Sequence, residues 1–227
     1  MENIPLFISI IFILTVLLTI LLFYKASNKP NTVIIVLAAW IIIQSIVGLL
    51  GFYTVSNTTP PRFLFLVLPP MLFIVVLFIT QKGRQYIDAF NVKTLTILHI
   101  VRIPVEVVLF LLFTYKAVPK IITFEGGNID ILSGITAPFI YYFGFVKKTL
   151  GKGLIIAWNI ICLVLLINVV ARALLSAPFP FQKFAFDQPN IAILYFPYIL
   201  LPGLIVPLVL FSHLVAIRQL GKKTHQS

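Results

Sequence analysis

Residues 4–24 read IPLFISIIFILTVLLTILLFY and contain no charged side chain. A helix that crosses the hydrocarbon core of a bilayer needs about 20 mostly apolar residues, so this stretch is long enough to span. Lys25 and Lys29 follow it directly, whereas Glu2 is the only charged residue before it. A cleaved signal peptide would begin with basic residues. The stretch therefore predicts a retained transmembrane helix.

Six further stretches have the same apolar character. With the first, they cover residues 4–24, 32–53, 63–80, 95–115, 131–146, 153–175 and 191–217. The fifth is short and follows a Gly-Gly-Asn break, so a tilted helix or a re-entrant segment is the alternative there. We predict an all-α fold in which residues 1–227 form a single transmembrane domain, a polytopic bundle of seven helices.

The composition points to the same class of protein. Of the 227 residues, 60% are hydrophobic and 10% are charged, and the mean hydropathy is +1.10. Soluble domains are usually about 45–50% apolar and about 25% charged, so the expected partner of this surface is the lipid bilayer. Cys162 is the only cysteine. The chain therefore forms no disulfide within itself and has no thiol pair for metal binding.

The formal net charge is +11, which in a soluble protein would suggest nucleic acid. Here the basic residues occupy the gaps between apolar stretches, where they set topology, and we expect no nucleic-acid partner. One set of alternating gaps holds Lys25, Lys29, Lys82, Arg84, Lys93, Lys147, Lys148, Lys152, Arg218, Lys222 and Lys223. The other set holds Arg62, Lys116, Lys120 and Lys183. The richer set is expected in the cytoplasm, with the N-terminus outside and the C-terminus inside, and the alternation favours seven spans over six.

Three ionisable residues interrupt the fourth apolar stretch: His99, Arg102 and Glu106. Their spacing places them on one helix face. Arg102 and Glu106 are four residues apart and can pair directly, although Pro104 can bend the helix between them. Ionisable groups at this depth are costly unless paired or hydrated, and they usually mark function. The stripe predicts a binding or coupling site; the alternative is a neutral pair that holds helices together.

A second histidine, His213, lies in the seventh stretch at a depth similar to that of His99. One interpretation is that the two histidines ligate a haem or a transition metal, with Glu106 as a further candidate ligand. Another is that His99, Glu106 and His213 hold or pass a proton during transport. Taken alone, His213 is more typical of an interfacial residue that faces headgroups.

A looser polar group is expected near the outer surface. Arg172 ends the sixth stretch on the same face as Asn168, and Glu125 and Asp130 lie in the loop before the fifth stretch. Arg172 with one of these acids would clamp the loop onto the bundle. We favour that structural role over a substrate site.

Prolines are unusually frequent within the predicted spans. They are Pro69, Pro70, Pro104, Pro138, Pro197, Pro202 and Pro207. Each frees a backbone carbonyl and can kink its helix, so we expect bent helices around a cavity. No lysine lies inside a predicted span, which excludes a retinal Schiff base. Ser133 has no histidine at its expected depth, which argues against serine hydrolysis in the membrane.

These features favour a proton- or ion-linked small-molecule transporter or a ligand-binding membrane protein over an enzyme. Glu106 would exchange the proton or cation, Arg102 would tune Glu106 or meet an anionic group, and His99 would add pH sensitivity. The first alternative is a haem- or metal-binding redox protein that uses His99 and His213. The second is an assembly or receptor-like subunit without chemistry of its own. The short loops favour a bacterial inner membrane.

Overall fold

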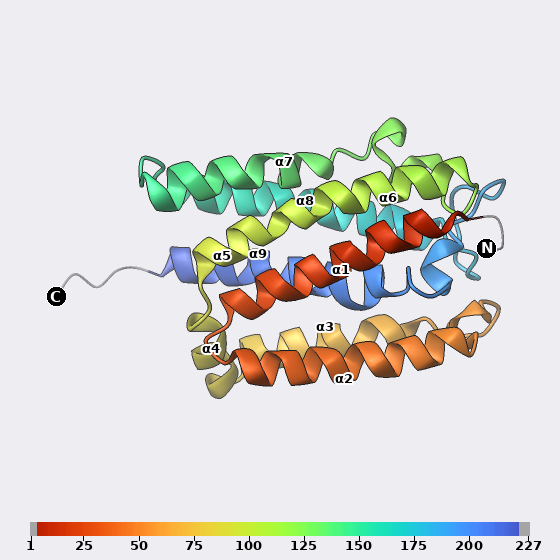
Figure 1. Ribbon diagram of the computed structural model, residues 1–227, viewed down its shortest axis with the longest axis horizontal. Helices are drawn as coiled ribbons and strands as arrows, with labels where there is room; N and C mark the ends of the chain where they lie inside the picture. The colour runs from red at the N-terminus through yellow and green to blue at the C-terminus, as the bar shows by residue number, and fades with distance from the viewer. Residues whose placement is uncertain (1–3, 223–227) are drawn as a thin grey trace.

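The computed structural model describes residues 4–222, and this part of the chain is helical without any strand. The long helices run roughly along one axis and form an elongated bundle (Figure 1). Lys223, one of the basic residues counted above, lies outside the described residues.

The helices follow the apolar stretches of the sequence. The α-helices are α1 Leu6–Ala26, α2 Pro30–Leu49, α3 Leu64–Ile79, α4 Gln81–Asp88, α5 Val92–Leu98, α6 Arg102–Thr114, α7 Ile131–Ile140, α8 Lys152–Leu175 and α9 Val206–Gly221. The 3₁₀ turns are η1 Phe52–Thr54, η2 His99–Val101, η3 Lys120–Ile122, η4 Phe124–Gly126 and η6 Ala192–Leu194. The segments η5 Tyr141–Val146 and η7 Leu201–Ile205 are π-helical.

Five helical segments of the described chain are long and apolar enough to cross a membrane. They are Leu6–Ala26, Pro30–Leu49, Val92–Thr114, Lys152–Leu175 and Leu201–Gly221. The pair α3 and α4 makes a sixth if it is counted as one span, but the two are bent by 95°. The segment Ile131–Val146 is a shorter apolar helix.

The seventh predicted stretch begins too early. Residues 191–200 form η6 and irregular turns, and the helix starts only at Leu201. This segment is apolar because it packs inward: Ala192, Ile193 and Leu194 are all buried. Hydropathy alone does not separate a buried apolar turn from a helix, whereas Pro197 marks the break.

The sharp bend between α3 and α4 begins where the sequence changes from apolar to polar. The Thr80 side chain caps α4 by accepting a hydrogen bond from the Gly83 amide at 3.1 Å. A Cβ at Gly83 would lie 2.4 Å from the Leu77 carbonyl oxygen, so the turn requires glycine. The polar helix α4 then crosses the end of the bundle instead of extending it (Figure 1).

Two prolines shape the helices that carry the candidate site. Pro104 cannot donate to the Ile100 carbonyl, and Ile100 lies in the 3₁₀ turn η2 between α5 and α6. Pro207 likewise frees the Gly203 carbonyl. That oxygen accepts a hydrogen bond from the Trp40 indole N–H at 2.8 Å, which ties α2 to η7.

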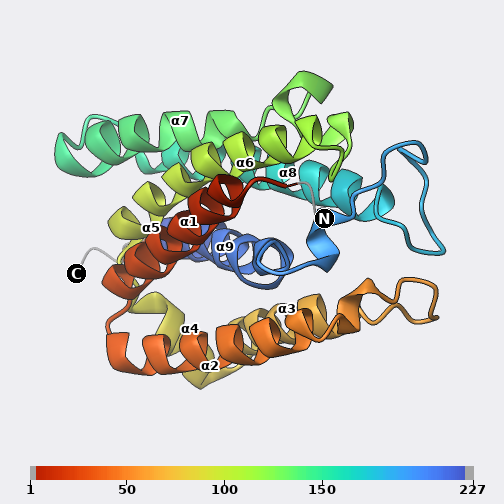
Figure 2. The same ribbon diagram turned by 45° about the vertical axis from the view of Figure 1, so that its right-hand side comes forward.

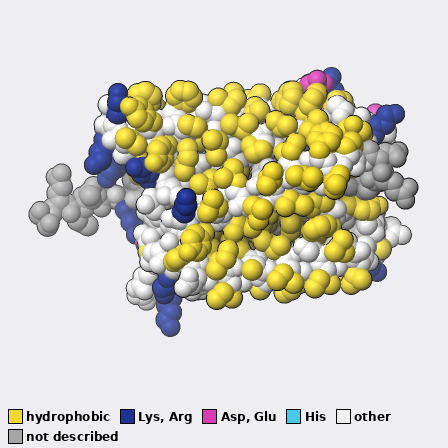
Figure 3. Space-filling model, in the orientation of Figure 1, with side chains coloured by type: hydrophobic (Ala, Val, Ile, Leu, Met, Phe, Trp, Pro, Cys, Tyr) yellow, Lys and Arg dark blue, Asp and Glu magenta, His cyan; other side chains and the backbone are white. Residues whose placement is uncertain are grey.

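The core of the bundle is formed by α1, α5, α6, α8 and α9, while α2 and α3 lie together on one side of it (Figures 1 and 2). An apolar cleft of about 590 Å³ lies between α2, α3 and α9. The outer surface is largely hydrophobic along the middle of the bundle, and dark blue basic side chains gather at one end (Figure 3).

Candidate functional site

The three ionisable residues of the predicted stripe all point into the bundle. The exposed fractions of His99, Arg102 and Glu106 are 0%, 3% and 1%. The helix α7 approaches this region closely, since a Cβ at Gly134 would lie 3.2 Å from the His99 carbonyl oxygen. The 3₁₀ turn η2 and Gly134, which lies opposite it on α7, thus place the stripe at the centre of the helix packing.

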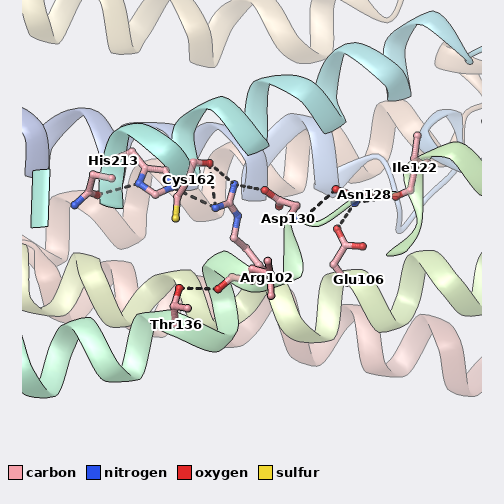
Figure 4. Close-up of polar contacts among 10 residues, drawn as sticks. Arg102, Glu106, Ile122, Asn128, Asp130, Thr136, Cys162 and His213 are labelled. Atoms are coloured by element: carbon pink, nitrogen blue, oxygen red, sulfur yellow. Dashed lines mark hydrogen bonds and ion pairs between the residues drawn. The ribbon is translucent and has the colours of Figure 1, made fainter. Parts of the chain in front are cut away.

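Arg102 pairs with Asp130 and not with Glu106. Its Nη2 lies 2.8 Å from Oδ1 of Asp130. The guanidinium also donates to the Cys162 carbonyl oxygen at 3.4 Å and to Nε2 of His213 at 3.3 Å (Figure 4). The direct Arg102–Glu106 pair that the spacing allows is therefore absent, because an acid from another segment occupies the fork.

Glu106 is held by an asparagine from the loop before α7. The Asn128 side-chain N–H donates to Oε1 of Glu106 at 2.6 Å and to the Ile122 carbonyl oxygen at 3.0 Å (Figure 4). Among the described residues, Oε2 of Glu106 has no hydrogen-bond partner. A buried carboxylate with one unused oxygen is costly unless it binds a proton or another donor.

The outer cluster predicted from the sequence does not assemble. Asp130 belongs to the central site, and its amide donates to Oδ1 of Asn128 at 3.1 Å. Glu125 pairs with Lys120 at 3.8 Å near the surface, and Asn168 is exposed on α8. Arg172 donates to the Ile121 and Gly126 carbonyl oxygens, both at 3.4 Å. Arg172 thus contacts the outer loop as expected, but through backbone oxygens and not through an acid.

The two histidines meet as a stacked pair. The ring centroids of His99 and His213 are 3.8 Å apart and their planes differ by 15°. Since a guanidinium only donates, Nε2 of His213 accepts from Arg102 and the ring proton lies on Nδ1. That Nδ1 is 2.9 Å from Oδ1 of Asn159. His213 is therefore a neutral, fully bonded member of the site and not an interfacial residue.

His99 has a different environment. Among the described residues neither of its ring nitrogens has a hydrogen-bond partner, and the His99 and Trp158 rings pack in a T-shaped arrangement with centroids 5.5 Å apart. Protonating His99 would place a second positive charge near Arg102 in the interior of the bundle.

The stacked histidines do not fit a shared metal. An imidazole nitrogen binds a metal in the plane of its ring, and two nearly parallel planes 3.8 Å apart do not converge on one ion. Within residues 4–222 no cluster of three or more His, Cys, Asp or Glu side chains has metal-site geometry. As arranged, His99 and His213 form a stacked pair in which only His213 is hydrogen-bonded.

A cavity of about 100 Å³ lies beside the ionisable groups. Arg102, Glu106, Asp130 and Asn190 are among the residues that line it. Its apolar walls include Val105, Leu109, Leu166, Val169, Ile205 and Val206. The cavity connects the ionisable stripe to the bent start of the last helix, η7 and α9.

Two asparagines of the site are missed by the sequence pattern. Asn128 and Asn190 lie in segments between apolar stretches, where polar residues are ordinary, yet their exposed fractions are 3% and 0%. Asn190 donates to the Ala173 carbonyl oxygen at 3.1 Å, and its own Oδ1 has no partner among the described residues. Only one sequence feature could have identified these asparagines, and it is weak. Each follows a turn-forming residue, Gly127 or Pro189, that brings the chain back to the bundle.

The site lies within the part of the chain that a family model covers. No curated protein and no solved structure matches the sequence. The family model matches residues 60–221, which include every residue of the buried cluster from His99 to His213. Helices α1 and α2 precede the matched region. The chain belongs to the family described as "Domain of unknown function (DUF8737)".

Proposed function

We propose that the chain is an integral membrane protein with seven spans, the N-terminus outside and the C-terminus in the cytoplasm. Five long apolar helices, the bent pair of α3 and α4, and the short Ile131–Val146 supply the spans. Their outward side chains are mostly apolar; Leu14 and Ile35, for example, are 59% and 67% exposed. Basic residues gather at one end, as the positive-inside rule expects (Figure 3). We place the protein in a bacterial inner membrane.

Its function in this proposal is proton-linked transport of a small molecule through the central cavity. Arg102 and Asp130 balance each other, so ionised Glu106 leaves one uncompensated negative charge in the interior. A buried charge of this kind is costly, and a proton or a cation that binds there removes the cost. Glu106 is therefore the coupling residue, and its unpaired Oε2 beside the cavity is the observation that carries the proposal.

The remaining polar groups position Glu106 and its neighbours. Asn128 fixes one carboxyl oxygen and leaves the other free. Asp130 holds Arg102, and His213 with Asn159 holds the far side of the guanidinium. The 3₁₀ turn η2 and the π-helical segment η7 lie next to the site, and such breaks allow a helix to change its bend during a transport cycle.

The test is gradient-driven uptake into liposomes that contain the purified protein. A mixture of small amines, carboxylates, sugars and amino acids is offered with and without an imposed pH gradient, and mass spectrometry measures what accumulates. We expect one solute class to accumulate with the gradient only, and Glu106→Gln to abolish this while Glu125→Gln, a change at an exposed acid, does not. Equal uptake by Glu106→Gln, or no accumulation of any class, would contradict proton-linked transport and favour a structural role for the cluster.

A further inference from the structure

Two residues that line the cavity each carry a buried acceptor atom that lacks a donor. Oε2 of Glu106 and Oδ1 of Asn190 have no hydrogen-bond partner among the described residues, and both side chains line the cavity. Their exposed fractions are 1% and 0%. Buried acceptors are normally satisfied, so this pair is suited to a bound molecule that brings N–H or O–H groups.

The positive side of the site is already occupied. Both terminal nitrogens of Arg102 have partners in Asp130, the Cys162 carbonyl or His213, and only Nε is unused. An anionic ligand would have to displace Asp130 from the guanidinium and would then face two uncompensated carboxylates. The site thus disfavours anions, although the sequence alone allowed Arg102 to meet one.

The charges of the site leave room for one further positive charge. Arg102 is positive, while Asp130 and Glu106 are each negative when ionised, so the three sum to one negative charge. A proton on Glu106 makes the site neutral, and a monovalent cation beside ionised Glu106 does the same. Both together would leave an excess positive charge in the interior, so binding of one opposes binding of the other.

Size and wall chemistry restrict the cation. The volume is about 100 Å³, whereas an apolar cavity of about 150 Å³ accommodates benzene, so the ligand should have fewer non-hydrogen atoms than benzene, roughly four or five. The walls at Val105, Leu109 and Val206 are aliphatic, which suits a short alkyl group better than a hydrated metal ion.

We propose that the cavity binds a small primary alkylammonium ion, whose N–H groups donate to Glu106 and Asn190, in exchange for the proton on Glu106. This inference rests on the proposed proton-linked function and names its substrate class. In the exchange the O–H bond of the Glu106 carboxyl breaks and the proton leaves to water. The ammonium keeps its own protons and its charge, so the net charge of the site is unchanged.

The experiment uses isobutylammonium as the probe and the purified protein in lipid nanodiscs. Proton release into weakly buffered solution is followed with a pH dye, binding is measured by calorimetry, and infrared spectroscopy follows the carboxyl band of Glu106. At a pH where Glu106 is protonated, we expect isobutylammonium to release about one proton per chain. The site accepts only one extra positive charge, so the proton must leave when the ammonium ion binds. Isobutanol, a neutral molecule of the same shape, should bind more weakly and release none.

The variants separate the two acceptors. Glu106→Gln should abolish both the proton release and the preference for the cation over the alcohol. Asn190→Ala should keep the infrared titration of Glu106 but weaken isobutylammonium binding about fivefold, the size of one lost hydrogen bond. Glu125→Gln is the matched control and should behave like the unaltered chain.

The outcomes distinguish the two proposals. If Glu106 titrates in the infrared but isobutylammonium releases no proton, the substrate class is wrong and proton-linked function stands. If Glu106 stays in one protonation state at every pH where the protein is folded, both proposals fail. If isobutanol binds as tightly as isobutylammonium, charge does not govern recognition and the ammonium assignment is overturned.

Discussion

The Arg102 side chain links α6 to three other helices of the bundle. Its side chain contacts Asp130 at the start of α7, the Cys162 carbonyl in α8 and His213 in α9. The ion pair is almost fully buried, with side-chain exposures of 3% and 6%. Buried pairs contribute little net stability when both partners are present, but the loss of one partner leaves an uncompensated charge.

We therefore expect Asp130→Asn to destabilise the fold by about 3 kcal/mol or more, because Arg102 then remains charged and loses its counter-ion. The free energy of unfolding is measured by titrating mixed micelles with a denaturing detergent. Trp158 reports on the region by fluorescence, since its ring packs against both histidines of the site.

The double variant Arg102→Met with Asp130→Asn should lose less stability than Asp130→Asn alone, because it removes both charges. Glu125→Gln is the matched control, since this acid is exposed and pairs only loosely with Lys120. If the double variant is less stable than Asp130→Asn by as much as Arg102→Met alone destabilises the unaltered chain, the two residues act independently.

The residues of the stripe are predictable because charge is rare in an apolar stretch, so His99, Arg102 and Glu106 stand out. Their partners are not predictable in the same way. Asn128 and Asp130 lie in a loop that the sequence places at the outer surface, yet the fold turns this loop inward. Local polarity identifies a residue that needs a partner, but only the three-dimensional path of the chain identifies the partner.

At the scale of elements, α4 and the end of α9 form a second ionic contact at the basic end of the bundle. Asp88 at the end of α4 accepts from Arg218 at 3.0 and 3.2 Å and also pairs with Lys222. The Gln219 side chain adds bonds to the Ile87 and Phe90 carbonyl oxygens at 2.8 and 3.0 Å. These contacts fix the last turn of α9 against the linker that leads to α5.

This contact should weaken in acid. Burial alone would raise the pKa of Asp88, but the hydrogen bonds and charges of Arg218 and Lys222 outweigh it and place the pKa below its usual value. A carboxyl with a lowered pKa in the folded state stabilises the fold above its unfolded-state pKa, and this stabilisation is lost as the pH falls through the folded-state pKa. The stability difference between the unaltered chain and Asp88→Asn should therefore be largest near neutral pH and shrink in acid.

The measurement is the apparent melting temperature of both proteins across the pH range. The expected difference at neutral pH is modest, on the order of 1 kcal/mol or less, because the contact is partly exposed to water. Asp187→Asn removes an exposed carboxyl from the loop before α9 and serves as the control variant. A melting-temperature difference between the unaltered chain and Asp88→Asn that stays constant or grows in acid would contradict a lowered pKa of Asp88.

At the scale of the whole molecule, the apolar stretches predicted the helices well and their limits less well. Hydrophobicity measures whether a segment avoids water, and both a spanning helix and a buried turn do so. The turns at 191–200 were therefore included in the last stretch, although the helix begins at Leu201. In α3 the end near residue 80 was predicted, but the 95° bend into α4 depends on the Thr80 cap and on Gly83.

The alternation of loops between the two ends of the bundle yields a direct prediction of topology. The short segment Ile131–Val146 decides between seven spans and a re-entrant loop, because its two ends lie on opposite sides only if it crosses. In a Cys162→Ser background, single cysteines are introduced at Glu125 and Lys147, both of which are exposed. Single cysteines at Lys29 and Asn57, which are also exposed, provide the corresponding pair of positions on either side of α2.

A membrane-impermeant maleimide added to intact spheroplasts should label the cysteines at positions 57 and 125. Those at positions 29 and 147 should react only after permeabilisation, because the basic end of the bundle faces the cytoplasm. Equal labelling at 125 and 147 from one side would make Ile131–Val146 re-entrant and reduce the spans to six. The opposite labelling of all four positions would keep the seven spans but invert the protein, and the bent start of α9 at η7 would then lie nearer the cytoplasm.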